Sequence, residues 1–198
     1  MGIIVLGGLY IFVTGYRLSP MQAVRANTFV PGNANLIEEV DLEWGKCYLL
    51  QTPDQFFMAG CEKDGFLWVS HITCYTDRRP DDGVNTLAYL GWGPADDKRV
   101  TIFAVQTSDP QVAYVEAGEG SDRTRQSVSP GTPVVFQWTH TEIWLDDLAA
   151  HALSADGRLL YEYRYADESH CDSRELLWYP VDDPAEAWYP VDKSPDAS

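Results

Sequence analysis

Two hydrophobic patterns divide the chain near residue 35. Gly2 to Tyr16 reads GIIVLGGLYIFVTGY, an uninterrupted apolar run without a charged residue. From Leu36 onward, apolar and polar residues alternate over short stretches, which is the pattern of half-buried β-strands. We therefore expect one N-terminal hydrophobic helix followed by an all-β domain.

The alternating stretches are joined by residues that favour tight turns. Trp44-Gly45, Asp64-Gly65 and Asp156-Gly157 each separate two such stretches, and Asp-Gly in particular tolerates the positive φ angles of hairpin turns. Short strands with frequent turn signals predict an antiparallel β-sandwich or open barrel built from hairpins. The strands are expected at residues 36–43, 46–51, 56–63, 66–75, 99–107, 133–140 and 159–165, with helical candidates at 20–26 and 142–149.

The N-terminal run is a candidate membrane segment. Its 15 residues would span about 22 Å as a helix, and residues 17–19 would extend it to about 27 Å. That is short of the roughly 20 residues of a typical span, although Arg17 can snorkel and Tyr10 and Tyr16 suit the interface. We expect residues 1–19 to be a transmembrane anchor, with membrane contact through residues 2–19. A cleaved signal peptide, or a buried segment of a soluble domain, remains open.

The residues after the run predict a short helix and a break. Ser19, Pro20 and Gln22 occupy the N-cap, N1 and N3 positions of a capping box, and Pro31-Gly32 ends the segment. We interpret residues 20–35 as a short helix and stalk. Residues 36–181 would then form the β domain, and residues 182–198 a flexible acidic tail.

Charge is distributed unevenly along the chain. The net charge is −16, and Arg17 and Arg25 are the charged residues of the first 35, so the remainder carries −16 − 2 = −18. Phosphate groups are repelled by such an acidic domain. We therefore expect no nucleic-acid partner and no general attraction to anionic lipid.

Four cysteines are present, and hairpin geometry relates two of them. If residues 52–55 form a turn, the numbers of opposing residues add up to 107 or 108, which sets Cys47 opposite Cys61. A Cys47–Cys61 disulfide would fit an oxidising compartment. Two buried thiols in neighbouring strands are the alternative, and the sequence leaves both open.

No motif for catalysis, metal binding or a cofactor stands out. Phosphate-binding loops, nucleophile elbows and zinc-protease motifs are absent from the sequence. His170-Cys171-Asp172 are neighbours, and neighbours seldom converge on one metal ion. His151 should face Glu162 across the Asp156-Gly157 turn as a structural pair. We therefore expect no enzyme, no metal and no cofactor, while weak calcium binding by the Asp-Asp doublets stays open.

The C-terminal part contains one repeat. Trp178-Tyr179-Pro180-Val181-Asp182 recurs ten residues later as Trp188-Tyr189-Pro190-Val191-Asp192. Either the first copy ends the last strand and the second is a chance echo, or the aromatic residues bind another protein or a glycan. On the second interpretation the binding residues are Trp178, Tyr179, Trp188 and Tyr189.

The layout of the chain also resembles a known class of proteins. The hydrophobic run, the segment Leu18-Ser19-Pro20-Met21-Gln22-Ala23-Val24 and the stretch Ala155-Asp156-Gly157-Arg158-Leu159-Leu160-Tyr161 resemble small, largely uncharacterised membrane-anchored extracytoplasmic β-domain proteins of Gram-positive bacteria. The resemblance implies a single-pass protein of the cell membrane with its C-terminal domain outside the cytoplasm. We expect a non-enzymatic binding or sensing module of unknown ligand, with a carboxylate-using cell-envelope hydrolase as the alternative.

Overall fold

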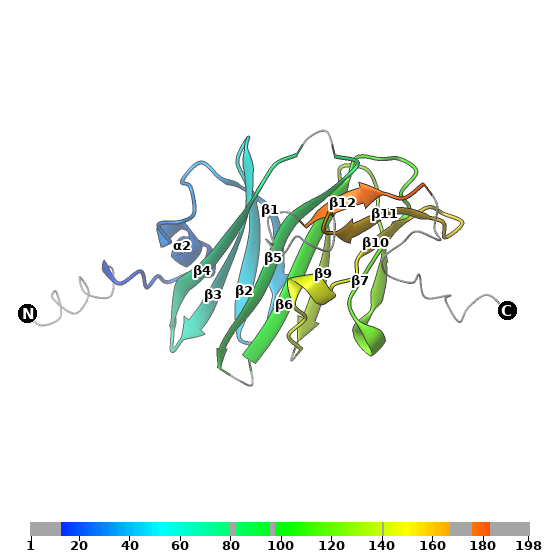
Figure 1. Cartoon of the computed structure of the whole chain (residues 1–198). Helices are drawn as coiled ribbons and strands as arrows, with labels where there is room; N and C mark the ends of the chain where they lie inside the picture. Colours follow the sequence, from blue (N-terminus) through cyan, green and yellow to red (C-terminus); the bar gives the residue numbers. More distant parts are fainter. Residues whose placement is uncertain (1–12, 80–81, 96–97, 140, 167–175, 183–198) are drawn as a thin grey trace, which may run out of the picture. The chain divides into compact units, whose positions relative to one another are not determined.

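The computed structural model describes residues 13–79, 82–95, 98–139, 141–166 and 176–182 (Figure 1). The chain divides into two compact units, residues 1–78 with 87–98 and residues 79–86 with 99–198. Antiparallel strands make up most of the described residues, and α2 is the one α-helix among them. The all-β fold class is therefore confirmed.

The first unit contains a four-stranded antiparallel sheet in the order β1-β2-β3-β4. Neighbouring strands follow one another along the chain, as the hairpin signals predicted, and Gly65 in the Asp64-Gly65 turn has a φ of 61°. The strand boundaries lie within two residues of the predicted ones. The strands are β1 (Asn35–Asp41), β2 (Gly45–Gln51), β3 (Gln55–Asp64) and β4 (Leu67–Asp77).

Helix α2 (Pro20–Ala26) packs on one face of this sheet, beside β3 and β4 (Figure 1). Ser19 caps it, because its Oγ accepts a hydrogen bond from the backbone N–H of Gln22 at 3.4 Å. Ala23 and Val24 are buried in a cluster with residues from β2 and β3: Tyr48, Leu50, Phe57, Ala59 and Cys61. The predicted helix is confirmed, but the segment that we expected to be a stalk is part of the folded unit.

The opposite face of the same sheet is closed by Trp92, from β5 (Val84–Ala95). A Cβ atom on Gly60 would lie 2.7 Å from the Trp92 ring, so a side chain at this position would clash with the ring. Trp44 packs edge-on against Trp92 with ring centroids 4.5 Å apart. The sequence pattern missed β5 because Gly91, Gly93 and Pro94 interrupt its alternation.

The second unit contains a five-stranded sheet in the order β12-β11-β10-β7-β8, and an antiparallel pair formed by β6 and β9. Strands β7, β8 and β10 have three or four residues each, which is too short for a clear alternating pattern. The elements are β6 (Lys98–Thr107), β7 (Tyr114–Ala117), η1 (Gly120–Asp122), β8 (Thr124–Ser127), β9 (Val134–Thr139), η2 (Leu145–Asp147), β10 (His151–Leu153), β11 (Leu159–Arg164) and β12 (Leu177–Pro180).

An aromatic cluster forms the core of the second unit. The ring of Phe103 on β6 lies 6.2 Å from Phe136 on β9, 5.5 Å from Tyr163 on β11 and 6.5 Å from Trp178 on β12. Tyr163 and Trp178 face each other across neighbouring strands, at a centroid distance of 5.3 Å. These contacts hold the β6–β9 pair against one face of the five-stranded sheet.

Two further predictions can be compared with the fold. Residues 142–149 form no α-helix, but only the three-residue 3₁₀ turn η2. Thr101 Oγ1 accepts a hydrogen bond from Ile143 N–H and donates one to the carbonyl oxygen of Thr141, so a tertiary contact with β6 fixes the start of this segment. None of the described helices is long and apolar enough to cross a bilayer. Most of the predicted anchor (residues 1–12) and most of the predicted tail (residues 183–198) lie outside the described residues.

Replacing Phe103 with alanine should destabilise the second unit strongly. Phe103 is fully buried and contacts three other aromatic rings, and such truncations cost about 3–5 kcal/mol. Urea unfolding followed by tryptophan fluorescence measures the loss. Trp144→Ala is the control, because Trp144 is 63% exposed and should change the free energy of unfolding by less than about 1 kcal/mol. Equal effects of the two variants would contradict this core.

Candidate functional site

A row of polar side chains crosses the five-stranded sheet of the second unit. The strand register sets Tyr179 opposite Glu162, Glu162 opposite His151, His151 opposite Glu116, and Glu116 opposite Arg125. Directly opposed residues of antiparallel strands point to the same face. The five side chains, one from each strand, therefore form a continuous polar ladder on the face opposite Tyr163. The predicted pairing of His151 with Glu162 is confirmed.

Three arginines hold the two carboxylates of the polar ladder. Arg125 and Arg123 both form ion pairs with Glu116, Arg123 at 3.4 Å. The Nε of Arg164 lies 3.3 Å from Glu162, and its guanidinium stacks 4.6 Å from the centre of the Tyr179 ring. The glutamate side chains are only 8% and 1% exposed, so without these arginines each buried negative charge would be costly.

The protonation state of His151 follows from its neighbours. One guanidinium nitrogen of Arg123 lies 2.8 Å from Nδ1 of His151. A guanidinium can only donate hydrogen bonds, so Nδ1 is the acceptor and the ring proton of this neutral histidine is on Nε2. That Nε2 lies 3.7 Å from Oε1 of Glu162. The imidazole is therefore hydrogen-bonded at Nδ1, while its buried Nε2 has no hydrogen-bond partner among the described residues.

Arg123 also fixes two loops to the sheet. It donates hydrogen bonds to the carbonyl oxygens of Gly118 at 3.2 Å and Ala149 at 2.9 Å, in addition to its contacts with Glu116 and His151. Ala149 has a φ of 40°, a left-handed conformation that is unfavourable for alanine. The guanidinium of Arg123 therefore helps to hold the strained residue in place.

The polar ladder is suited to structure more than to acid–base catalysis. A catalytic carboxyl group has to reach the proton of a substrate. Glu116, Glu162 and His151 are almost completely buried, and both glutamates are already paired with arginine. Among the described residues, no three His, Cys, Asp or Glu side chains could hold a metal ion together. His170 and Cys171 lie outside the described residues.

The predicted site residues of the C-terminal repeat lie in different surroundings. Trp178 is buried in the aromatic core, and its Nε1 donates a hydrogen bond to Thr86 Oγ1 at 3.1 Å. Tyr179 points to the other face, where it is half-buried beneath Arg164. Trp188 and Tyr189 lie outside the described residues. Of the described pair, only Tyr179 is exposed enough to contact a ligand directly.

The strand register separates the two cysteines that we considered for a disulfide. Cys61 lies opposite Lys46, and Cys47 lies opposite Gly60. Because neighbouring residues of a strand point to opposite faces, the two thiols leave opposite sides of the sheet. Both are free and buried, in agreement with the alternative of two buried thiols. Burial raises the pKa of the Cys61 thiol to about 12 and that of Cys74 to about 11, and it also raises the pKa of Cys47.

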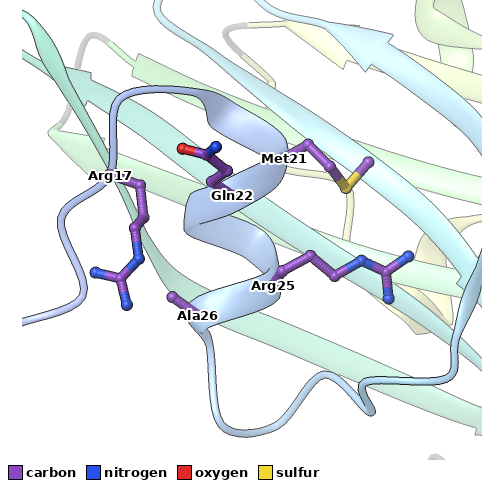
Figure 2. Close-up of a pocket in the computed structure, with 5 residues that line it drawn as sticks. All are labelled: Arg17, Met21, Gln22, Arg25 and Ala26. Atoms are coloured by element: carbon purple, nitrogen blue, oxygen red, sulfur yellow. The ribbon is translucent and has the colours of Figure 1, made fainter. Parts of the chain in front are cut away.

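A groove of about 420 Å³ lies along α2 in the first unit, lined by Arg17, Met21, Gln22, Arg25 and Ala26. Figure 2 shows that Arg17 comes from the segment before the helix and the other four from α2 itself. The guanidinium groups of Arg17 and Arg25 point away from each other in this view. The groove is therefore a surface with a positive charge at two separate places, and not a closed anion pocket.

Comparisons of the chain with protein-family models, with curated proteins and with solved structures found no match. The functional argument consequently depends on the chemistry of these surfaces.

Removing the Arg123 guanidinium should destabilise the second unit. In Arg123→Met, the buried carboxylate of Glu116 and two loop carbonyls lose a partner, which typically costs about 3–5 kcal/mol. Arg99→Met is the matched control, since the Arg99–Glu142 ion pair is 45% and 40% exposed and should contribute less than about 1 kcal/mol. Urea unfolding of both variants tests this, and a loss for Arg123→Met no larger than the control would argue against the clamp.

The buried Cys47 and Cys61 and the half-buried Cys74 should resist alkylation in the native protein. A rise in the pKa of Cys61 from 9.0 to about 12 leaves about 1000-fold less thiolate at neutral pH. Iodoacetamide labelling at pH 8, read for each cysteine by peptide mass spectrometry, should be slow for Cys47, Cys61 and Cys74 and rapid in urea. The native rates should increase with pH as thiolate forms. Fast native labelling at neutral pH would show that these strands are not packed as described.

Proposed function

We propose that this protein is a non-enzymatic binding or sensing module, held at the outer side of the cell membrane by its N-terminal apolar segment. The observation that supports it best is the direct attachment of this segment to a folded unit. Arg17, one residue after the run, exchanges two backbone hydrogen bonds of 2.8 Å with Trp68 of β4. Apolar residues placed immediately beside a folded surface suit an anchor that holds the domain close to a bilayer.

Two further contacts strengthen this attachment. The Tyr16 hydroxyl donates a hydrogen bond to Asp64 Oδ2 at 3.0 Å, and Asn27, which follows α2, donates to Ser70 and Thr73 of β4. The chain between residues 16 and 27 is thus held to the sheet at both ends and in the middle, through Ala23 and Val24. A membrane anchor formed by the preceding residues would therefore be joined to the folded unit without a flexible linker.

The described carboxylates favour binding over the alternative of a cell-envelope hydrolase. Glycosidase-type chemistry needs two carboxyl groups that flank a substrate bond. Glu116 and Glu162, the buried pair of the polar ladder, instead flank His151 and are held by arginines. We propose that these two glutamates contribute to the correct pairing of the strands in the sheet. We also propose that the strands form a sandwich or open barrel, which presents the ligand surface.

The ligand in this proposal is a protein or a glycan that contacts the aromatic repeat. Tyr179 on the edge strand β12 would make a direct contact, while Trp178 would position it from the core. Trp188 and Tyr189 would add a second aromatic pair. Aromatic side chains with a polar group suit both protein and glycan surfaces.

Membrane fractionation of the full-length chain tests the anchor. The protein should stay in the membrane pellet after extraction with alkaline carbonate, and protease added to intact cells should digest the β domain. Leu9→Arg should reduce the pelleted fraction several-fold, because an arginine in the middle of an apolar span costs about 2.5–3.5 kcal/mol. Leu9→Ala is the control and should remain in the pellet. Recovery of the unmodified chain in the soluble fraction would contradict the proposal.

A further inference from the structure

Large apolar side chains are exposed around α2. Ala23 and Val24 face the sheet, whereas Gln22 and Arg25 are exposed on the outward side of the helix. Leu18 and Phe29 lie outside the helix, before its N-cap Ser19 and after its C-cap Asn27, and both are 76% exposed. Exposed apolar side chains therefore flank the polar outward side of α2.

A third exposed apolar side chain lies close to Leu18. Phe66, in the turn between β3 and β4, is 75% exposed. The backbone pairing of Arg17 with Trp68 brings Leu18 alongside the beginning of β4, and the Tyr16–Asp64 hydrogen bond ties the same turn to the N-terminal segment. We refer to Leu18, Phe29 and Phe66, together with Arg17 and Arg25, as the α2 surface.

The charge of this surface differs from that of the chain as a whole. Arg17 and Arg25 are the charged residues of the first 35, although the net charge is −16. The Arg25 guanidinium donates to the carbonyl oxygen of Pro31 at 3.4 Å, and within the described ranges it is in no ion pair with a carboxylate. A guanidinium placed beside exposed apolar side chains suits a phosphate group at the boundary between water and hydrocarbon.

We propose that the α2 surface lies on the bilayer, with Leu18, Phe29 and Phe66 at the level of the lipid headgroups and the two arginines directed to phospholipid phosphates. This inference rests on the proposed anchor, because the apolar run ends beside the surface and Arg17 is fixed to β4 without a spacer. That continuity favours the bilayer over a separate protein partner. It also assigns an orientation to the first unit, with its α2-covered face towards the membrane.

Site-specific fluorescence in reconstituted vesicles tests the proposal on the full chain. Phe29→Cys and Phe66→Cys, each in a Cys171→Ser background, would carry an environment-sensitive dye. Cys47 and Cys61 are buried and Cys74 is half-buried, and burial raises the pKa of all three thiols, so they should stay unlabelled under native conditions. Asp54→Cys is the control, because Asp54 is exposed in the turn that precedes β3, at the other end of this ten-residue strand from Phe66, about 30 Å away.

The vesicles would contain phosphatidylcholine and phosphatidylglycerol, with or without nitroxide-labelled lipid. Dyes at residues 29 and 66 should lose at least half of their emission to the nitroxide and shift to shorter wavelength, while the dye at residue 54 should change by less than a tenth. In an Arg25→Gln background, the response at residue 29 should fall by about half and lose its dependence on phosphatidylglycerol.

Two negative outcomes have different meanings. If the chain sediments with the vesicles but the dyes at residues 29 and 66 respond no more than the one at residue 54, the anchor stands and the inference about the α2 surface is overturned. If the emission of these dyes shifts to shorter wavelength but is not quenched by the nitroxide, the dyes contact protein and not lipid. The inference about the α2 surface is overturned in that case too. If the chain does not sediment with the vesicles, the proposed anchor fails, and the inference fails with it.

Discussion

Strand register is the constraint on which both units depend. In an antiparallel pair the opposed residues share a face, so a shift of one residue would move every side chain to the other side of the sheet. In the second unit the register aligns one polar residue from each of five strands, and the residues next to them, such as Tyr163 and Trp178, point to the aromatic core. The same register therefore sets both the apolar packing on one face and the polar ladder on the other.

The polar ladder has a cost that the fold has to offset. Burial of Glu116 and Glu162 removes their hydration, and the favourable charge pairs with arginine compensate only when the geometry is good. Arg123 adds contacts with two loop carbonyls and with Nδ1 of His151. An apolar row could stabilise the sheet equally well, but it would tolerate a two-residue shift of a strand, which keeps the same face and would separate the buried carboxylates from their arginines. We infer that the ladder contributes specificity of strand pairing and loop position.

In the first unit, the charge of the α2 surface differs in sign from the net charge of the chain. An acidic protein is expected to avoid phosphate, yet two arginines lie beside exposed apolar side chains on the α2 surface. Charges farther away than about 10 Å are strongly screened at physiological salt. The groups close to a surface thus decide what it attracts, and net charge is a poor guide to a single face.

The sequence by itself determined the local structure. Alternation and turn residues predicted the four strands of the first unit, the capping box predicted α2, and the Asp156-Gly157 turn paired His151 with Glu162. These features depend on neighbours along the chain, where geometry follows from residue type. Short or glycine-interrupted strands such as β5, β7 and β8 carried too little pattern to be recognised.

Only the tertiary structure decided which surfaces these elements form. Cys47 and Cys61 were one residue away from facing each other, and the observed register sends them to opposite faces. Residues 20–35 were predicted to be a stalk, whereas in the structure Ala23 and Val24 pack on β2 and β3. Arg123 joined His151 and Glu116 through a loop contact that no periodicity encodes. The physical reason is the same in each case, since contacts between distant residues depend on register and packing, which single-sequence patterns constrain only to within a residue or two.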